Sequence, residues 1–159
     1  MSEDRTKYIS PLSTRYASDD MQYIFSEEFK FRTWRKLWIS LARSEQKLGL
    51  NITDEQIAEL EAHATDINFD EAKAREKIVR HDVMSHVYAY GLQCPKAEPI
   101  IHLGATSCYV TDNTDVIVLR EASKLVLKRQ ARSLKTFLSL LRNTRLFPVL
   151  HILTYSPLS

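Results

Sequence analysis

The chain has 159 residues and a mass of 18.4 kDa, which allows one domain or one domain and part of a second. Its three glycines are too far apart for a GxGxxG dinucleotide turn or a GxxxxGK phosphate loop, and they are too few for a turn-rich β-barrel. The scarcity of glycine favours an all-α fold. A net charge of +2 is too weak to imply nucleic-acid binding. No apolar stretch approaches the roughly 18 residues of a membrane span, so we expect a soluble, cytoplasmic protein.

The first strong helical pattern covers residues 26–48. Ser18 to Asp20 offer N-capping groups before it, and apolar residues that include Trp34 and Trp38 recur at helical spacing within it. We expect both tryptophans in the core. Gly49 follows where a left-handed residue commonly ends a helix, so it predicts the C-terminal cap.

A second helix is predicted to begin at Thr53. Gln56, three residues later, completes the pattern of a capping box, and Ile57 and Leu60 form the buried stripe. This helix should end before residues 66–68.

A third helix is predicted from Asp70 to Tyr90, with Gly91 closing it. Prolines then interrupt the chain, and residues 92–107 are expected to form a buried, irregular or short extended segment.

The longest predicted helix runs from about Thr111 to Asn143, which at 1.5 Å per residue corresponds to ~50 Å. Too few residues follow to cover it, so we expect it to pack against the rest of a bundle or another subunit. The predicted division is residues 1–107 as a helical domain, 108–145 as the first helix of a central bundle, and 146–159 as an aberrant tail. The helical spacing of three and four residues is carried by Val116, Leu119, Ser123, Val126, Gln130, Ser133, Phe137 and Leu141.

Arg80, His81 and Asp82, followed by Ser85 and His86, form the first candidate site. A histidine between an arginine and an aspartate is suited to binding phosphate or carboxylate. The alternative is a charged, solvated turn. In a helix, His81 and Ser85 would share one face while His86 points elsewhere, and the spacing of the two histidines does not fit a helical zinc pair, so no metal is expected.

A second candidate site precedes the long helix. His102 lies near the hydroxyls of Thr106 and Ser107, and glycine beside hydroxyls at a helix start can hold an anion. The alternative is that these hydroxyls only cap the helix. Arg15 and Tyr16 near the N-terminus pair a guanidinium with a phenol, which alone means little.

Two further features have simple interpretations. The basic residues of the long helix lack interleaved aromatic residues, so they are expected to form a solvated face and not to bind nucleic acid. Cys94 and Cys108 lack the spacing of a zinc site and are expected to be reduced thiols.

Several separated strings, in family order, resemble the animal-type adenylosuccinate lyase family over about residues 8–145. The resemblance places the chain in the fumarase/aspartase superfamily and implies an all-α fold, assembly of the full-length family as a homotetramer, and no metal or organic cofactor. The first string is SPLSTRYAS, whose last eight letters are residues 11–18. The others are FKFRTWRKLWISLARSEQKLGL (29–50), RHDVMSHV (80–87), CPKA (94–97) and IIHLGATSCYVTDNTD (100–115).

The resemblance also implies an activity in purine biosynthesis. The family eliminates fumarate from adenylosuccinate, giving AMP, and from the succinylated aminoimidazole carboxamide ribotide. A base removes the Cβ proton, an acid protonates the leaving nitrogen, and fixed cations and amides stabilise the developing charge. Residues that match the family's substrate-binding motifs are Arg15, Tyr16, Arg80, His81, Asp82, His102, Thr106 and Ser107.

The sequence departs from the family after the long helix. The Thr-His-x-Gln-Pro-Ala-Gln motif, whose histidine is the general acid, and the later GSSxMPxKxNP loop, whose serine is the base, are absent from the 159 residues. His151 has the wrong neighbours for the acid. One set of codons for Val149 to Ser159, read two bases further on, encodes Thr-Ala-Tyr-Thr-His-Leu-Gln-Pro-Ala-Gln, so the tail is expected to be a frame-shifted product.

This departure predicts a chain with binding residues and no catalytic ones. We therefore expect the 159-residue chain to be the N-terminal part of a lyase and inactive alone. The alternative is a non-catalytic helical fragment that associates with full-length subunits.

Overall fold

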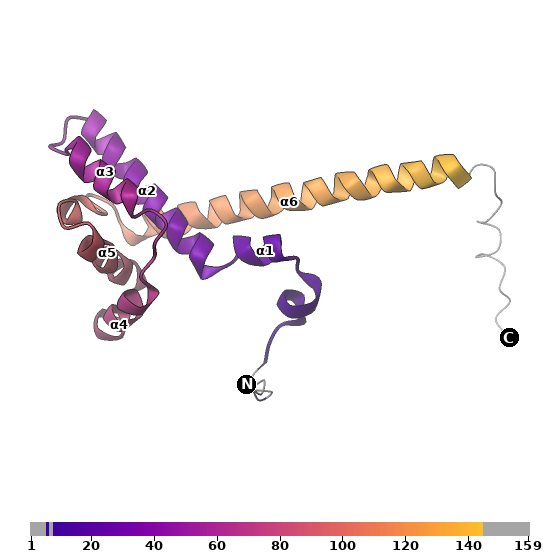
Figure 1. Cartoon of the computed structure of the whole chain (residues 1–159), viewed down its shortest axis with the longest axis horizontal. Helices are drawn as coiled ribbons and strands as arrows, with labels where there is room; N and C mark the ends of the chain where they lie inside the picture. The colour runs from indigo at the N-terminus through magenta and orange to yellow at the C-terminus, as the bar shows by residue number, and fades with distance from the viewer. Residues whose placement is uncertain (1–5, 7, 145–159) are drawn as a thin grey trace. The chain divides into compact units, whose positions relative to one another are not determined.

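The computed structural model describes residue 6 and residues 8–144, and the predicted tail, 146–159, lies outside them. All regular structure in these described residues is helical, which confirms the all-α prediction. None of the described helices is long and apolar enough to cross a membrane. The elements in chain order are η1 (Leu12–Tyr16, a π-helix), α1 (Asp19–Ile24), α2 (Glu27–Lys47), α3 (Asp54–Ala62), α4 (Phe69–Val79), α5 (Asp82–Gln93), η2 (Glu98–Ile100, a 3-10 helix) and α6 (Ser107–Thr144) (Figure 1).

The chain forms two compact units, Met1–Arg120 and Glu121–Ser159. The predicted division into residues 1–107, 108–145 and 146–159 stays a prediction.

Local capping signals set the ends of α1 and α2. The hydroxyl of Ser18 accepts a hydrogen bond from the Met21 N–H (3.4 Å), and the hydroxyl of Ser26 accepts one from the Phe29 N–H (3.2 Å). Gly49 follows α2 with φ +94°, the left-handed conformation that glycine adopts without a steric cost. These predictions for residues 18–49 are confirmed.

The capping box of α3 is also present. The Thr53 hydroxyl accepts from the Gln56 N–H (3.2 Å), and the Gln56 side chain accepts from the Thr53 N–H (3.0 Å). Ile57 and Leu60 are buried on the inner face, as predicted. Helix α3 packs beside α2 (Figure 1).

The core of the first unit is an aromatic cluster between α2 and α5. Trp34 and Trp38 are 0% and 1% exposed, as predicted for core residues, and their rings meet edge to face at 6.1 Å. Tyr90 of α5 packs against Trp38, and the buried ring of His86 stacks on Phe31 at 3.6 Å. Edge-to-face and offset contacts of this kind add to the free energy gained from burial.

A buried arginine ties three segments to this core. Arg35 of α2 donates to the carbonyls of His63 and Asp66 and, at 2.6 Å, to the Gln93 side chain. Its guanidinium lies 4.1 Å above the Tyr90 ring. Because several acceptors and an aromatic face satisfy this cation, its burial fixes the α3–α4 connection against α2 and α5.

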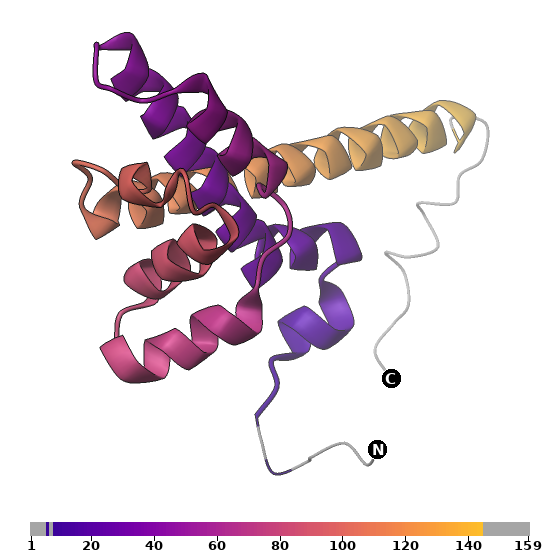
Figure 2. The same cartoon turned by 60° about the vertical axis from the view of Figure 1, so that its left-hand side comes forward.

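The predicted helix from Asp70 to Tyr90 is wrong in one respect, because it is two helices. Arg80 adopts a left-handed conformation, φ +53°, and ends α4, and His81 is extended and begins α5. Figure 2 shows α4 and α5 lying side by side, joined at one end by this short turn. Folding back lets α5 bury Val83, which a continuous helix would carry away from α2.

Gly91 does not close the helix, contrary to the prediction. It lies inside α5, and a Cβ built there would come 2.9 Å from Cγ of Glu98, so close approach of the following segment explains the glycine. The helix ends at Gln93, because Pro95 cannot continue it. Residues 94–106 are irregular apart from η2, as predicted, whereas residues 92–93 still belong to α5 and residue 107 begins α6.

The long helix α6 begins four residues before its predicted start at Thr111, at Ser107. In the first unit its initial turns bury Val110 and Thr114.

The second unit is described from Glu121 to Thr144 and consists of the remainder of α6. Its side chains are largely exposed, including Leu134 at 58% and Phe137 at 56%. Large apolar residues exposed in this segment are Val126, Leu127, Leu134, Phe137, Leu138, Leu140 and Leu141.

Candidate functional site

The turn between α4 and α5 presents the Arg80–Asp82 motif. Arg80 ends α4 with its N–H bonded to the Glu76 carbonyl (2.7 Å). His81 then caps α5, since its Nδ1 accepts a hydrogen bond from the Met84 N–H at 3.4 Å. The motif thus lies at a helix N-terminus, where free N–H groups and the helix dipole favour anions.

His81 connects this turn to the start of α6. Its Nε2 lies 3.2 Å from Oγ of Ser107, a residue 26 positions further along the chain. Because Nδ1 accepts from Met84, the hydrogen of the neutral ring belongs on Nε2, which donates to the Ser107 oxygen. The Asp82 carboxylate lies 3.8 Å from Nδ1 and accepts from the Val83 N–H (2.8 Å).

His102 is held in the loop that leads to α6. It is left-handed, with φ +64°, which is uncommon for a residue other than glycine. Its Nδ1 accepts a hydrogen bond from the indole N–H of Trp38 at 3.0 Å. Burial, and then the nearby His81 ring, lower the pKa of His102 and favour its neutral form.

Thr106 and Ser107 begin α6 beside these rings. The Thr106 hydroxyl accepts from the Cys108 N–H (3.4 Å), so it acts as a helix cap, as the simpler interpretation expected. Glu45 flanks the same loop, with Oε1 3.6 Å from where a Cβ on Gly104 would stand. Its Oε2 is buried without a hydrogen-bond partner in the described chain, and burial raises the pKa of this carboxyl.

The structure therefore brings both histidine motifs together, and we call His81, Asp82, His102, Thr106 and Ser107 the histidine cluster. Arg80 adjoins it with an exposed side chain. The cluster combines imidazoles, hydroxyls and helix N-termini, which are groups that bind the oxygens of phosphates and carboxylates.

Arg15 and Tyr16 do not join the histidine cluster. They lie at the end of η1, where the Arg15 guanidinium carbon is 5.6 Å from the centre of the Tyr16 ring. Both side chains are exposed. Within the described residues no contact connects this pair to His81 or His102.

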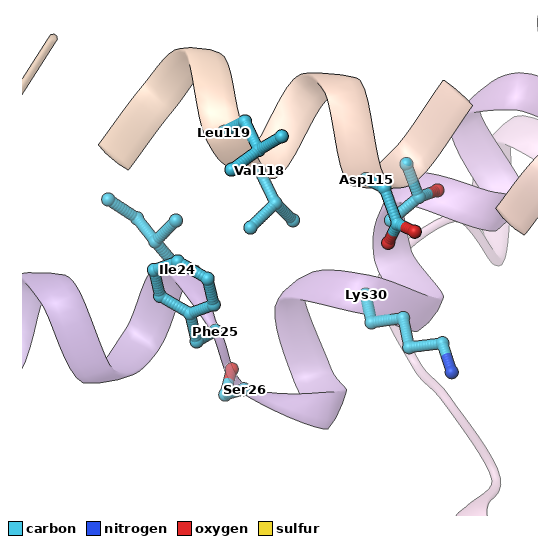
Figure 3. Close-up of a pocket in the computed structure, with 8 residues that line it drawn as sticks. Ile24, Phe25, Ser26, Lys30, Asp115, Val118 and Leu119 are labelled. Carbon is cyan, nitrogen blue, oxygen red and sulfur yellow. The ribbon is translucent and has the colours of Figure 1, made fainter. Parts of the chain in front are cut away.

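A groove of about 360 Å³ lies elsewhere in the first unit, between the α1–α2 junction and α6. Figure 3 shows Ile24, Val118 and Leu119 facing one another across it, with the Lys30 ammonium pointing away. Thr114 also lines it, and the buried Thr114 hydroxyl has no partner in the described chain. The groove contains no residue that the sequence predicted for the site, and its lining is mainly apolar.

Sequence reasoning identified both histidines but missed their partners. The sequence predicts Trp38 only as a core residue, yet its indole N–H donates a hydrogen bond to His102. No sequence signal links residues 64 positions apart, and the N–H donor of Met84 belongs to the backbone. His86, in contrast, is buried against Phe31 and does not contribute to the cluster.

In the part of the chain that the structure describes, no group of three or more His, Cys, Asp or Glu side chains could hold a metal ion. Cys94 is buried and Cys108 exposed, and both are free thiols.

The described residues form an all-α protein in which imidazoles and hydroxyls gather at the starts of α5 and α6. Comparison with known proteins is more specific. The chain is 51% identical over 126 residues to adenylosuccinate lyase of Schistosoma mansoni, 52% over 130 residues to that of Schizosaccharomyces pombe, and 50% over 129 residues to that of Saccharomyces cerevisiae. No protein-family model matches.

These matches cover 79–80% of this chain and 26–27% of the relatives, so the chain spans about a quarter of their length. At such identity over most of its residues, the chain belongs to the adenylosuccinate lyase family, and it corresponds to part of the length of these relatives. The resemblance inferred from the sequence is confirmed.

Proposed function

We propose that this chain is the N-terminal, substrate-binding part of an adenylosuccinate lyase. The observation that carries the proposal is the contact between Nε2 of His81 and Oγ of Ser107, which unites two motifs that the sequence assigns to substrate binding. The relatives at about 50% identity are named for the same activity, which supports it.

The proposed ligand is a nucleotide, adenylosuccinate or its product AMP. Imidazole and hydroxyl donors of the histidine cluster bind its phosphate or carboxylate oxygens, and the arginine and tyrosine of η1 add a cation and a phenol. The proposed substrate-binding residues are Arg15, Tyr16, Arg80, His81, Asp82, His102, Thr106 and Ser107.

The whole lyase would eliminate fumarate from adenylosuccinate. The bond from Cβ to hydrogen and the bond from Cα to nitrogen break, the electron pair forms the fumarate double bond, and the nitrogen leaves protonated as part of AMP. We place this activity in a cytoplasmic homotetramer, with residues 1–107 as the helical N-terminal domain and 108–145 as the first bundle helix. The proposed reaction uses no metal and no organic cofactor.

AMP titration of matched histidine variants tests the binding site. His81→Asn keeps an N-cap oxygen for the Met84 N–H but removes the ring nitrogen that contacts Ser107, so we expect AMP affinity to fall about tenfold with little change in stability. Calorimetry measures the affinity.

His63→Asn is the control, because its side chain is 37% exposed against 43% for His81 and pairs instead with Asp66. It should bind AMP like the unmodified chain. Equal affinity of the His81→Asn variant and the unmodified chain would contradict the assignment.

The chain is expected to bind a nucleotide without catalysing the elimination. The 159 residues contain neither family motif that would supply the acid and the base, so purified chain should release no fumarate from adenylosuccinate above a control without protein. Absorbance of the substrate follows the reaction, and turnover would refute this expectation.

One observation favours a second candidate function, association with full-length lyase subunits. Exposed residues such as Leu134 and Phe137 give α6 an apolar surface in the described part of the second unit, which is typical of a bundle helix. Size-exclusion chromatography with intact lyase distinguishes the outcomes: mixed oligomers support the association, and separate elution of the two proteins opposes it.

A further inference from the structure

The hydrogen bond between Trp38 and His102 fixes which ring nitrogen carries the hydrogen. An indole N–H can only donate, so Nδ1 of His102, 3.0 Å away, must be the acceptor. In the neutral ring the single hydrogen is then on Nε2. The rings meet nearly at right angles, 80°, with their centres 6.1 Å apart.

Burial holds this arrangement in place. Trp38 is 1% exposed and packs against Trp34 and Tyr90, so its N–H has little freedom to turn towards water. Protonating Nδ1 of His102 would set two donors against each other and place a cation near His81. Both effects favour the neutral ring, in agreement with the lowered pKa of His102.

The backbone shows the same constraint. His102 has φ +64°, a conformation that costs free energy for a residue with a side chain and persists only where its surroundings enforce it. The Trp38 bond is the hydrogen bond that its side chain makes within the described residues, and Nε2 has no partner there.

His81 has an equivalent arrangement. Its Nδ1 accepts from the Met84 N–H, so its Nε2 is also the donor. Both histidines of the cluster therefore carry the hydrogen on Nε2, which in His81 is directed to Ser107.

We propose that Trp38 is a positioning residue that fixes His102 as its neutral Nε2–H tautomer, so that the ring offers a hydrogen-bond donor to an anionic oxygen of the bound nucleotide. The identity of the ligand rests on the proposed function, whereas the tautomer does not. His102 acts in this scheme as neither a base nor a cation.

Nitrogen NMR of the full chain with ¹⁵N-labelled histidine tests the tautomer directly. We expect His102 to show an unprotonated Nδ1 and a protonated Nε2. A protonated Nδ1 in the unmodified chain would overturn the proposal, and this measurement needs neither a variant nor a ligand.

Two matched tryptophan variants test the cause. Trp38→Phe keeps an aromatic ring but removes the donor, so the His102 signals should shift towards a mixture of both tautomers. Trp34→Phe is the control, because Trp34 is equally buried and its indole N–H has no partner in the described chain. If both variants leave the His102 signals unchanged, Trp38 does not set the tautomer.

Ligand titrations of the same samples separate this inference from the proposed function. AMP carries a phosphate and fumarate carries carboxylates, so the probe that shifts the Nε2 signal of His102 identifies the class of oxygen that it binds. Trp38→Phe should weaken that probe's binding about three- to tenfold.

A probe that shifts His81 signals but leaves His102 unchanged would overturn the donor role while sparing the proposed function. If neither probe binds the chain, the proposed function fails, along with the donor role, and the tautomer result stands by itself.

Discussion

Residues 8–120 and residues 121–144 are both helical, yet they are stabilised differently. The first region buries Trp34, Trp38 and Tyr90 in one cluster and closes its helices with side-chain caps. The second is a single helix whose large apolar residues, such as Phe137, are exposed. Isolated helices are marginal in water, since most helical stability in proteins comes from packing of an apolar face. Helix content alone therefore does not indicate a core.

The largest expected effect comes from removing a core ring. Trp34→Ala leaves a cavity in the aromatic cluster and should lower the free energy of unfolding by about 3–5 kcal/mol, measured by urea denaturation. Phe137→Ala is the counterpart in the second region. Because Phe137 is 56% exposed, its loss should change stability by no more than about 0.5 kcal/mol. A comparable loss in both variants would mean that the second region is packed in solution.

A pH effect of about 3 kcal/mol is expected from the buried histidine of the first region. Burial, together with the cations Arg35 and Lys30, lowers the pKa of His86 from 6.5 to about 4, although Asp82 opposes this. In the unfolded chain this histidine binds a proton near pH 6.5, so between pH 6.5 and pH 4 the unfolded state holds more protons. Its contribution to stability is therefore complete above pH 6.5 and is lost progressively down to pH 4.

Urea midpoints across this pH range measure the effect. His86→Phe keeps a ring to stack on Phe31 but cannot titrate, so stability of this variant should depend less on pH. Carboxylates that titrate in the same range affect both proteins equally. Identical slopes for the two proteins would show that folded His86 titrates like a solvated histidine.

The two regions also differ in how well the sequence predicts them. Caps such as Ser26 and the Thr53–Gln56 box are local signals, so the limits of α2 and α3 follow directly from the sequence. The break at Arg80 has no glycine or proline to mark it. It arises because α5 must fold back to bury its residues against α2, which is a tertiary requirement and is invisible in a single helical pattern.

Like the fold, the candidate site is predictable from the sequence only in part. Its histidines and hydroxyls stand out as motifs, and the structure brings His81 and Ser107 within 3.2 Å. Their hydrogen-bond donors do not stand out, because Trp38 is also an ordinary core residue and Met84 contributes only its backbone. Spacing also does not show that Arg15 makes no contact with these residues within the described part of the chain.

The smallest effect is expected from removing the N-cap of α3, which lies in the first region. Thr53→Ala removes the hydroxyl that accepts from the Gln56 N–H and should lower the free energy of unfolding by about 1 kcal/mol. Thr53→Asn restores an acceptor of similar reach and should recover most of the loss. Urea denaturation beside Trp34→Ala measures both. Because α3 contributes Ile57 and Leu60 to the core, packing should hold the helix even when its cap is gone. A loss as large as that of Trp34→Ala would mean that caps, and not the aromatic cluster, distinguish the first region from the second.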